Sequence, residues 1–537
     1  MHNLLIVKDA DIDHVPLYLF ILFNLSLDVV FAAIDLGKKT DFTLAVPRVR
    51  IKQDVKALIS KIVEEFTTNE YVDGIVPDSP FIYFYCNTVI LSRTVLDKFY
   101  ISSRPAESGT TIPYGSNTSG TGKNIIVENS SPNIAKSFYA GHLRSTVIGA
   151  FISNLFQANG DLSSEIGLLA VGFKRFGSEE EFQKNAILHL FNIYVAINKE
   201  AETERSEAGE QVINTEARNF FRKMENGDEE VLALWKRFRD LSIKKYEETY
   251  GRLNVHFDIY AGESQVKPET IVKAMDILPR EGPRPLALAI DLKKWHLDKP
   301  VVQKPDDTTI YIMRDIAGAI ERYEKSKFDK IIYVVGDQQN LHIAQFFKIL
   351  SLMELPFAST LEHVNFGRFL EDILDTAQEA MLEQMQKNET KIQEIRDPEY
   401  TADQVGMTCV KGDTGVYLQY AHTRLCSVER KVAQSVTITS HSEADTSLLV
   451  EPEARDIIYL LATFPNVVKA SLKTYESSTI VTYCFKLSHA ISSAWERLIV
   501  MGQEQKLVQA WLYLYIYARD VLATGMRLLS LAPLDRM

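Results

Sequence analysis

A strand that leads directly into a glycine-containing helix constrains the fold of this chain more than any other feature. The β-branched run Ile125–Val127 ends in a turn around Asn133, and helical periodicity begins at Gly141 and His142. Gly160 is suited to end that helix. Apolar residues recur at i, i+4 spacing at Leu143, Val147, Phe151 and Leu155. The pattern predicts a strand that delivers the chain to the N-terminus of a buried helix.

This geometry is suited to holding phosphate groups. Free amides and the helix dipole point at an anion bound to a helix N-terminus. The amide of Gly141 can approach a nucleotide closely because no Cβ intervenes, and His142 can donate a hydrogen bond to charge developing on a phosphoryl group. For an isolated Gly-His pair, the default interpretation is a buried helix start with a hydrogen-bonded core histidine.

Length and composition set the class of protein. A chain of 537 residues is too long for one core, so three domains are expected. The net charge of −12 argues against a generally basic surface for nucleic acid, although it leaves room for local basic grooves. The cysteines have no C-x-x-C spacing, so we expect neither a metal site nor a disulfide framework. We expect the protein to be in a reducing compartment. The cysteines are Cys86, Cys409, Cys426 and Cys484.

The segment 15–34 is the only membrane-like stretch of the sequence. Asn24 and Asp28 interrupt it, and acidic residues precede it. A signal peptide has a positive flank, and a spanning helix needs about 20 uninterrupted apolar residues. We therefore expect a buried helix and strand here, no membrane association, and a cytoplasmic protein.

Composition shifts divide the chain into four parts. Residues 1–103 are predicted to form an α+β domain, and the Gly/Ser/Thr/Pro-rich residues 104–123 an exposed linker or hairpin. In 124–395, strands alternate with helices as in a Rossmann-type parallel sheet, with a helical insertion at about 199–300. Residues 396–537 have an all-α pattern.

Individual elements follow from periodicity. Strands are predicted at 42–46, 81–85 and 330–335, the last being an apolar run typical of a buried parallel strand. A helix is predicted at 55–66. Helical spacing also joins Val231, Leu234, Trp235, Phe238 and Leu241, which we interpret as core residues.

Residues 130–149, SSPNIAKSFYAGHLRSTVIG, resemble the HIGH-type signature of class I arginyl-tRNA synthetases, SSPNIAK-x-x-H-x-G-H-L-R-S-T. The resemblance continues through segments of all three predicted domains. It implies a class I synthetase catalytic domain between an α+β N-terminal domain and an α-helical anticodon-binding domain. It also implies ATP binding by Lys136, Tyr139, Gly141 and His142, with His142 and Lys136 in catalytic roles. Tyr139 stands where the family has the first histidine of its signature.

The resemblance places an arginine site beside this signature. A guanidinium is planar and permanently charged, so a specific pocket needs converging carboxylates and amide or phenol oxygens. Tyr311 and Asp315 lie in a family-like stretch, and their spacing puts them on one face of a helical turn. The implied arginine-binding residues are Glu128, Asn133, Tyr311, Asp315 and Gln339. Without the motif, the default interpretation is a solvated charged helix face made by Asp315, Arg314, Glu321 and Arg322.

Two regions resemble tRNA-binding parts of the same family. The implied tRNA-binding residues are Phe81, Tyr417, Tyr420, Arg424 and Met537. At the D-loop positions, Asp78 and Tyr83 stand where the family has Asn and Gln. Ile499 falls where fungal-type members often carry Trp.

The implied activity is arginine–tRNA ligation. L-arginine and ATP, bound with Mg²⁺, would form arginyl-adenylate, and the arginyl group would pass to tRNA(Arg). We expect a monomer.

Three stretches of family sequence are absent. After Gly160 the family continues through a strand and a D-W-G sequence, whereas Asp161–Ile166 leads straight into Gly167. After Gly367 the family has its KMSKS-type loop, whereas Arg368 follows here. A helical connection before Gly412 is also missing. The resemblance to the family is close on both sides of each gap. Our hypothesis is therefore that coding segments are missing from this sequence. A non-catalytic tRNA-binding paralogue and, less favoured, another class I synthetase or small nucleotidyltransferase are the alternatives.

Overall fold

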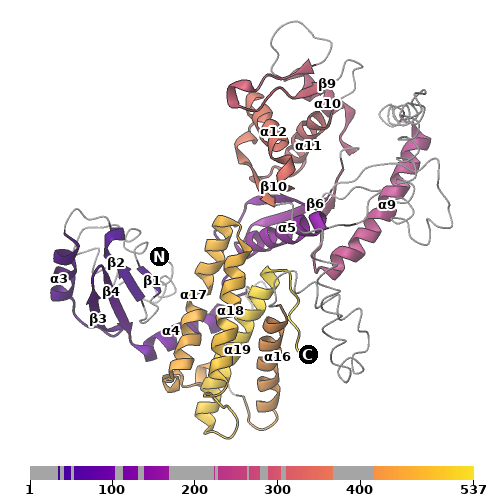
Figure 1. Cartoon of the computed structure of the whole chain (residues 1–537). Helices are drawn as coiled ribbons and strands as arrows, with labels where there is room; N and C mark the ends of the chain where they lie inside the picture. The colour runs from indigo at the N-terminus through magenta and orange to yellow at the C-terminus, as the bar shows by residue number, and fades with distance from the viewer. Residues whose placement is uncertain are drawn as a thin grey trace, which may run out of the picture. The chain divides into compact units, whose positions relative to one another are not determined.

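The chain is described by a computed structural model covering residues 34–36, 42–49, 54–102, 113–130, 138, 140–167, 223, 228–262, 265–278, 288–303, 310–366, 415–438 and 440–537. It divides into two compact units (Figure 1). One unit combines 1–117 with 380–537, and the other is 118–379. Of the segment 15–34, only Ile34 is described, so its predicted helix lies outside the described residues.

An antiparallel sheet forms the N-terminal part of the first unit. Its strand order is β1-β2-β4-β3. The alternating pattern that predicted strands at 42–46 and 81–85 is explained by one buried face, which packs on α3. Asp54 caps α3 by accepting a hydrogen bond from the Ala57 amide. The bounds are β1 Ile34–Leu36, β2 Phe42–Ala45, η2 Val46–Val49, α3 Val55–Glu65, β3 Val72–Asp78, β4 Phe81–Cys86 and α4 Thr88–Ser102.

The second unit is built on a five-stranded sheet of order β11-β10-β5-β6-β7, in which every pairing is parallel. Its strands are β5 Asn124–Glu128, β6 Leu162–Gly167, β7 Ile259–Tyr260, β10 Lys330–Gly336 and β11 Leu361–Phe366. The predicted Rossmann-type parallel sheet is confirmed. The chain runs from β5 to β6 and β7 on one side and then returns to β10 and β11 on the other. The strand order therefore reverses between β5 and β10.

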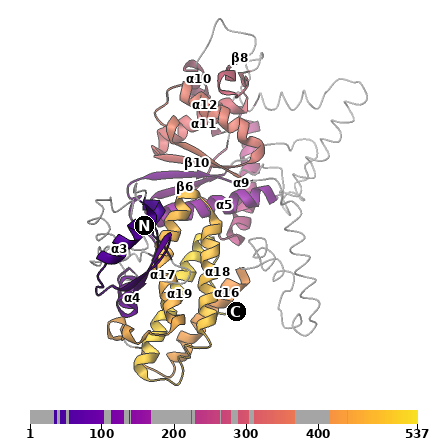
Figure 2. The same ribbon diagram turned by 60° about the vertical axis from the view of Figure 1, so that its left-hand side comes forward.

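Helices cover both faces of this sheet, with α11 and α12 on one side and α5 on the other (Figures 1 and 2). Ile126, Ile331 and Tyr333 face the core beneath α11 and α12. The remaining elements are α5 Ala140–Ala158, α9 Glu229–Arg252, α10 Pro268–Asp276, β8 Leu288–Ala289, η4 Lys293–Trp295, β9 Val301–Gln303, α11 Tyr311–Ser326, η5 Asp337–Gln339, α12 Asn340–Leu352 and η6 Ala358–Thr360.

Four long helices form the C-terminal part of the first unit, as the sequence predicted (Figure 1). They are α16 Gly415–Val432, α17 Pro452–Thr474, α18 Ser477–Ala494 and α19 Gln505–Leu528, joined in part by η7 His441–Glu443 and η8 Thr446–Leu448. Among the described helices, none combines the length and apolar character needed to cross a membrane.

Two expectations need correction. Tyr114, in the predicted exposed linker, is buried and packs against Phe99 at 4.8 Å between ring centroids, because one aromatic side chain outweighs its polar surroundings. The pairing of β7 with β6 shows that the main sheet resumes inside the stretch expected to be a helical insertion. Gly160 ends α5 with φ of 85°, as predicted.

Candidate active site

The point where the strand order reverses is the place where parallel α/β sheets bind ligands, outside the carboxyl ends of the strands. Here β5 ends at Glu128 and β10 at Gly336, and Glu128 is in register with Tyr333. The start of both strands is fixed by Asp329, whose carboxylate accepts from the Asn124 amide at 2.7 Å. The two carboxyl ends therefore meet in a defined register.

Glu128 lies in an ion pair that sequence reasoning missed. Arg322 Nη1 is 2.8 Å from Glu128 Oε2, with 16% and 14% of the two side chains exposed. The same Nη1 donates to Tyr333 Oη at 3.3 Å. Burial raises the pKa of Glu128, Arg322 opposes that rise, and Asp315 adds to it. Arg322 lies seven residues after Asp315 on α11, and this spacing is the signal that places both on one helix face.

The pair is held by charge more than by an aligned hydrogen bond. Within the described residues, Glu128 Oε2 and Arg322 Nε are buried without a hydrogen-bond partner of acceptable geometry. Buried polar groups of this kind are uncommon, and one explanation for them is a ligand that completes their bonding. For Arg322, the interpretation as part of a solvated helix face is wrong.

Asp315 joins the same electrostatic group. His342 Nε2 lies 2.7 Å from Asp315 Oδ2, with 35% and 32% of the side chains exposed. Glu128, Asp315, Arg322, Tyr333 and His342 form what we call the acidic cluster. It holds two carboxylates against one permanent cation, so it keeps surplus negative charge while His342 is neutral. His342 was missed by sequence reasoning, although its place in the first turn of α12 puts it near the strand ends.

The other predicted arginine-binding residues are less enclosed. Tyr311 begins α11 and is 70% exposed, and Gln339 is exposed in η5 just before α12. Tyr311 and Asp315 both lie on α11, as the spacing predicted. Asn133, Lys136 and Tyr139 lie outside the described residues.

A hydroxyl network fixes the N-terminal half of α5 against β5 and β10. The Ser130 amide donates to Ser145 Oγ at 2.8 Å, and Ser145 Oγ donates to the Val334 carbonyl at 2.9 Å. Thr146 Oγ1 lies 2.5 Å from Ser130 Oγ, which also lies 2.9 Å from the Tyr250 hydroxyl of α9. Ser130 has φ of 56°, in the left-handed region. The Ser and Thr of the signature therefore hold the helix in place.

The predicted phosphate-binding residues Gly141 and His142 stand in the first turn of α5. His142 is 7% exposed, and its ring centroid is 5.7 Å from that of Phe138. Further along α5, Gly149 allows a close approach. A Cβ added there would lie 2.2 Å from Asn129 Cγ, so any larger residue would push Asn129 away from the end of β5.

The helical part of the first unit carries an aromatic and cationic surface on α16. Arg424 lies over Trp495 at 4.0 Å and near Tyr420 at 5.3 Å, and Tyr420 is 51% exposed. The Tyr417 hydroxyl is 3.3 Å from Ser492 Oγ. Exposed rings beside a guanidinium form a stacking platform suited to unpaired bases.

Two other residues predicted to contact tRNA are exposed but are not part of α16. Met537 is 73% exposed and Phe81 is 38% exposed. At one substituted D-loop position, the Tyr83 hydroxyl donates to Asp78 at 3.2 Å. The two substituted residues therefore bond with each other.

Two family models match consecutive parts of the chain. The catalytic domain described as "tRNA synthetases class I (R)" matches residues 112–415, and the DALR anticodon binding domain matches residues 418–537. The chain belongs to the arginyl-tRNA synthetase family. It is therefore an arginine–tRNA ligase by family, and the family's substrates are L-arginine, ATP and tRNA(Arg).

Individual relatives point the same way. "Arginine--tRNA ligase, cytoplasmic" of Saccharomyces cerevisiae is 44% identical, covering 93% of this chain and 90% of that protein. "Probable arginine--tRNA ligase, cytoplasmic" of Schizosaccharomyces pombe is 38% identical, covering 100% and 97%. That comparison extends over 617 positions, more than the 537 residues here, so this relative has residues without a counterpart in this chain.

Solved structures share the fold. The arginyl-tRNA synthetase of Thermus thermophilus matches with a TM-score of 0.68 and 18% identity, over 94% of this chain and 96% of that one. The enzyme from Plasmodium falciparum matches with a TM-score of 0.69 and 18% identity, over 94% of each chain.

Proposed function

We propose that this chain binds the cationic end of L-arginine at the acidic cluster and the phosphates of ATP at the N-terminus of α5. The observation that carries the proposal is the buried Glu128 carboxylate, whose Oε2 lacks an aligned donor although Arg322 is 2.8 Å away. A guanidinium offers five donors in a planar fork and can complete such a carboxylate. Asp315 supplies a second acceptor and the surplus negative charge.

The reaction then has two balanced steps. An oxygen of the arginine carboxylate attacks the α-phosphorus of ATP, the bond to pyrophosphate breaks, and arginyl-adenylate forms. Mg²⁺ enters with ATP as part of the substrate and neutralises phosphate charge. A ribose hydroxyl of tRNA(Arg) next attacks the arginyl carbonyl, loses its proton, and releases AMP. Chemistry of this kind depends on positioning and on donors aimed at the developing charge, which is the role proposed for Gly141 and His142.

The remaining assignments concern Lys136, Tyr139 and the tRNA. Lys136 is proposed to stabilise the pyrophosphate leaving group, because Arg368 follows Gly367 where the family has its lysine-bearing loop. Tyr139 is proposed to contact ATP in place of the family's histidine, and Asn133 to hold the amino acid. The α16 surface is proposed to bind the anticodon, and the chain to act as a cytoplasmic monomer.

Arginine-dependent ATP–pyrophosphate exchange in the presence of tRNA(Arg) tests this function, together with filter binding of the same tRNA. Citrulline is the matched ligand, because it keeps the shape of arginine and lacks its charge. We expect arginine to support exchange and citrulline to fail at the same concentration. Asp315→Asn should abolish the preference for arginine over citrulline. Glu324, exposed on the same helix as Asp315, provides the control, and Glu324→Gln should keep that preference.

Two results would point elsewhere. Binding of tRNA without exchange supports the non-catalytic paralogue. A peptide from expressed protein that spans Gly367 to Phe369 without additional residues contradicts the hypothesis of missing coding segments.

A further inference from the structure

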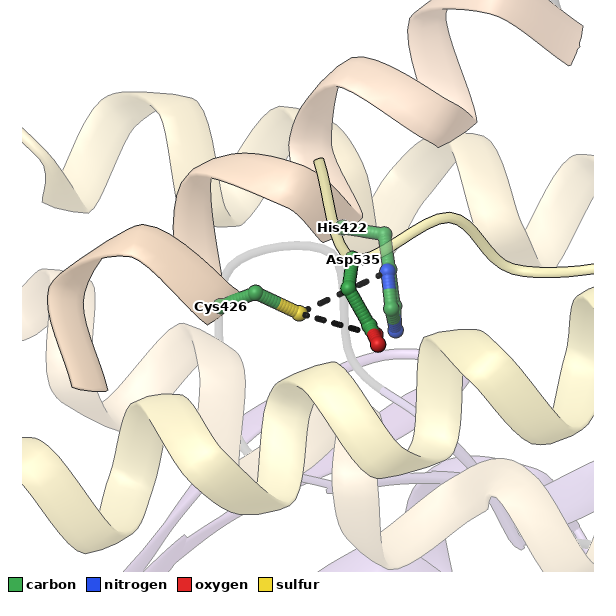
Figure 3. Close-up of side chains that lie close together, drawn as sticks. All are labelled: His422, Cys426 and Asp535. Carbon is green, nitrogen blue, oxygen red and sulfur yellow. Dashed lines mark hydrogen bonds between the residues drawn. The ribbon is translucent and has the colours of Figure 1, made fainter. Parts of the chain in front are cut away.

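Three side chains that commonly bind metal ions converge beside α16, within the part of the chain that the structure describes. A ring nitrogen of His422, the sulfur of Cys426 and a carboxylate oxygen of Asp535 all lie within 4.8 Å of one another (Figure 3). His422 and Cys426 are four residues apart on α16, which puts them on one face of the helix. Asp535 comes from the end of the chain, so the spacing of the cysteines could not indicate this group. We call these three residues the His-Cys-Asp cluster.

The distances within the cluster suit one ion bound by all three side chains. Cys426 Sγ lies 3.7 Å from His422 Nδ1 and 3.9 Å from Asp535 Oδ1. Zinc bonds of roughly 2.0–2.3 Å in a tetrahedron place the ligand atoms about 3.4–3.6 Å apart. A small contraction would therefore bring the cluster to the geometry of a zinc site. The Leu534 carbonyl oxygen, 2.8 Å from His422 Nδ1, is placed to supply a fourth ligand.

The order of the three groups does not suit nucleophilic catalysis. In the site of a cysteine nucleophile, the imidazole stands between the thiol and the orienting group, so that it can take the thiol proton. Here the Cys426 thiol stands between the other two side chains. Burial raises the pKa of Cys426, whereas an activated nucleophile needs a lowered pKa. Burial lowers the pKa of His422, which favours the neutral imidazole that metal ions bind.

The backbone that carries Asp535 is fixed by α16 without any ion. Gln419 Nε2 donates to the Ala532 carbonyl at 2.7 Å, and Gln419 Oε1 accepts from the Leu534 amide at 2.9 Å. Arg430 Nη1 donates to the Asp535 carbonyl at 3.0 Å. An ion would therefore enter a site whose ligands are already held close together, and such preorganisation lowers the cost of binding.

Burial and charge also favour a divalent cation here. His422 is 4% and Cys426 6% exposed, whereas Asp535 is exposed and leaves a route for an ion from solvent. Two guanidinium groups act on the thiol. Arg519 is already paired with one carboxylate on α16 and one on α19, and Arg430 is bonded to the Asp535 carbonyl. Once the thiol has lost its proton, the cluster carries two negative charges, which balance one divalent ion.

We propose that the His-Cys-Asp cluster is a structural Zn²⁺ site that fastens the end of the chain to α16. The ligands are His422 Nδ1, Cys426 Sγ and an Asp535 carboxylate oxygen, with the Leu534 carbonyl as the fourth. On binding, the thiol proton leaves to solvent and the imidazole proton moves from Nδ1 to Nε2. Without the ion, Nδ1–H donates to the Leu534 carbonyl. Mixed nitrogen, sulfur and oxygen ligands favour Zn²⁺ over Mg²⁺ and Ca²⁺, which prefer oxygen alone.

Titration with Co²⁺ tests the site in the full chain, kept reduced, freed of metal ions and carrying no histidine tag. Co²⁺ can take the place of Zn²⁺, and its bond to a thiolate gives a charge-transfer band in the near ultraviolet. We expect this band to saturate at one ion per chain and to disappear when Zn²⁺ is added. Cys426→Ser should abolish the band, and Asp535→Asn should weaken Co²⁺ binding about tenfold or more. Cys86→Ser, at a partly exposed cysteine of β4, is the matched control and should titrate like the parent chain.

A second readout separates loss of the site from damage to the fold. Circular dichroism of the metal-free variants checks that each has folded. Zn²⁺ should slow hydrogen exchange in the peptide that ends the chain, in the parent and in Cys86→Ser but not in Cys426→Ser. A folded parent without a thiolate band, or an equal band in Cys426→Ser, would overturn the proposal and leave the cluster as hydrogen-bonded packing. Neither readout uses arginine, ATP or tRNA, so the test is independent of the proposed function.

Discussion

Replacing Arg322 by methionine should expose how the protein tolerates the buried Glu128 carboxylate. Breaking a buried pair from one side leaves an uncompensated charge and commonly costs about 3–5 kcal/mol. Glu128 can avoid that cost by taking up a proton. At pH 7 this costs about 3.4 kcal/mol for a carboxyl of ordinary pKa 4.5, and at pH 5 about 0.7 kcal/mol. The lost bond to Tyr333 adds about 1 kcal/mol at either pH.

The penalty should therefore depend on pH with a defined sign. In Arg322→Met the folded-state pKa of Glu128 rises further above its unfolded value. The penalty is then smallest at low pH, where Glu128 is protonated in both proteins, and grows as pH increases. We expect destabilisation by about 4 kcal/mol at pH 7 and by about 2 kcal/mol at pH 5, the change coming from protonation of one carboxyl.

Hydrogen exchange of the intact chain at increasing urea concentrations, followed in the fragments that contain β5 and β10, measures this penalty for the sheet itself. Lys325→Met, at an exposed position of the same helix, should have little effect at either pH. Glu128→Gln combined with Arg322→Met should remove the pH dependence. An equal penalty for Arg322→Met at pH 5 and pH 7 would refute the reasoning, because it would mean that Glu128 does not bury its charge in the folded chain.

Three further outcomes are expected. Asp315→Asn should weaken L-arginine binding about tenfold or more in calorimetry, through loss of a charged acceptor, whereas Glu324→Gln should not. Gly149→Ala should destabilise the second unit by about 1–3 kcal/mol in thermal unfolding, because its Cβ overlaps Asn129, and an unchanged midpoint would contradict the close packing. His422 has a lowered pKa, so folding stability of the helical part should fall as pH drops below about 6.5, and His422→Asn should flatten that dependence in urea titrations at pH 5 and pH 7.5.

Local pattern was sufficient where local forces decide the structure. The apolar run at 330–335 could only be buried on both faces, and it forms β10, which pairs with a strand on each side. The helix after Gly141 followed from its periodicity, and its glycine end at Gly160 from the need for positive φ. The family signature added the expected chemistry of these positions.

Contacts between distant segments could not be read from the sequence. Nothing near Glu128 indicates that Arg322 will reach it, because the pairing depends on the register of β5 with β10. The same holds for His342, which becomes a partner of Asp315 only when α12 packs beside α11. Tyr114 was missed for a different reason. The average composition of its segment is polar, and that average does not reveal a single buried residue.

The pairing of β5 with β10 has a consequence for the order of folding. The amide of Asn124 bonds to a carboxylate 205 residues later, so closing this loop costs roughly 5 kcal/mol of chain entropy before any pairing repays it. During synthesis, β5 can gain β6 early, but its other edge stays without a partner until residue 336 has emerged. The acidic cluster is then assembled among the last parts of the sheet, and slow synthesis between β7 and β10 would prolong the exposure of an unpaired central strand.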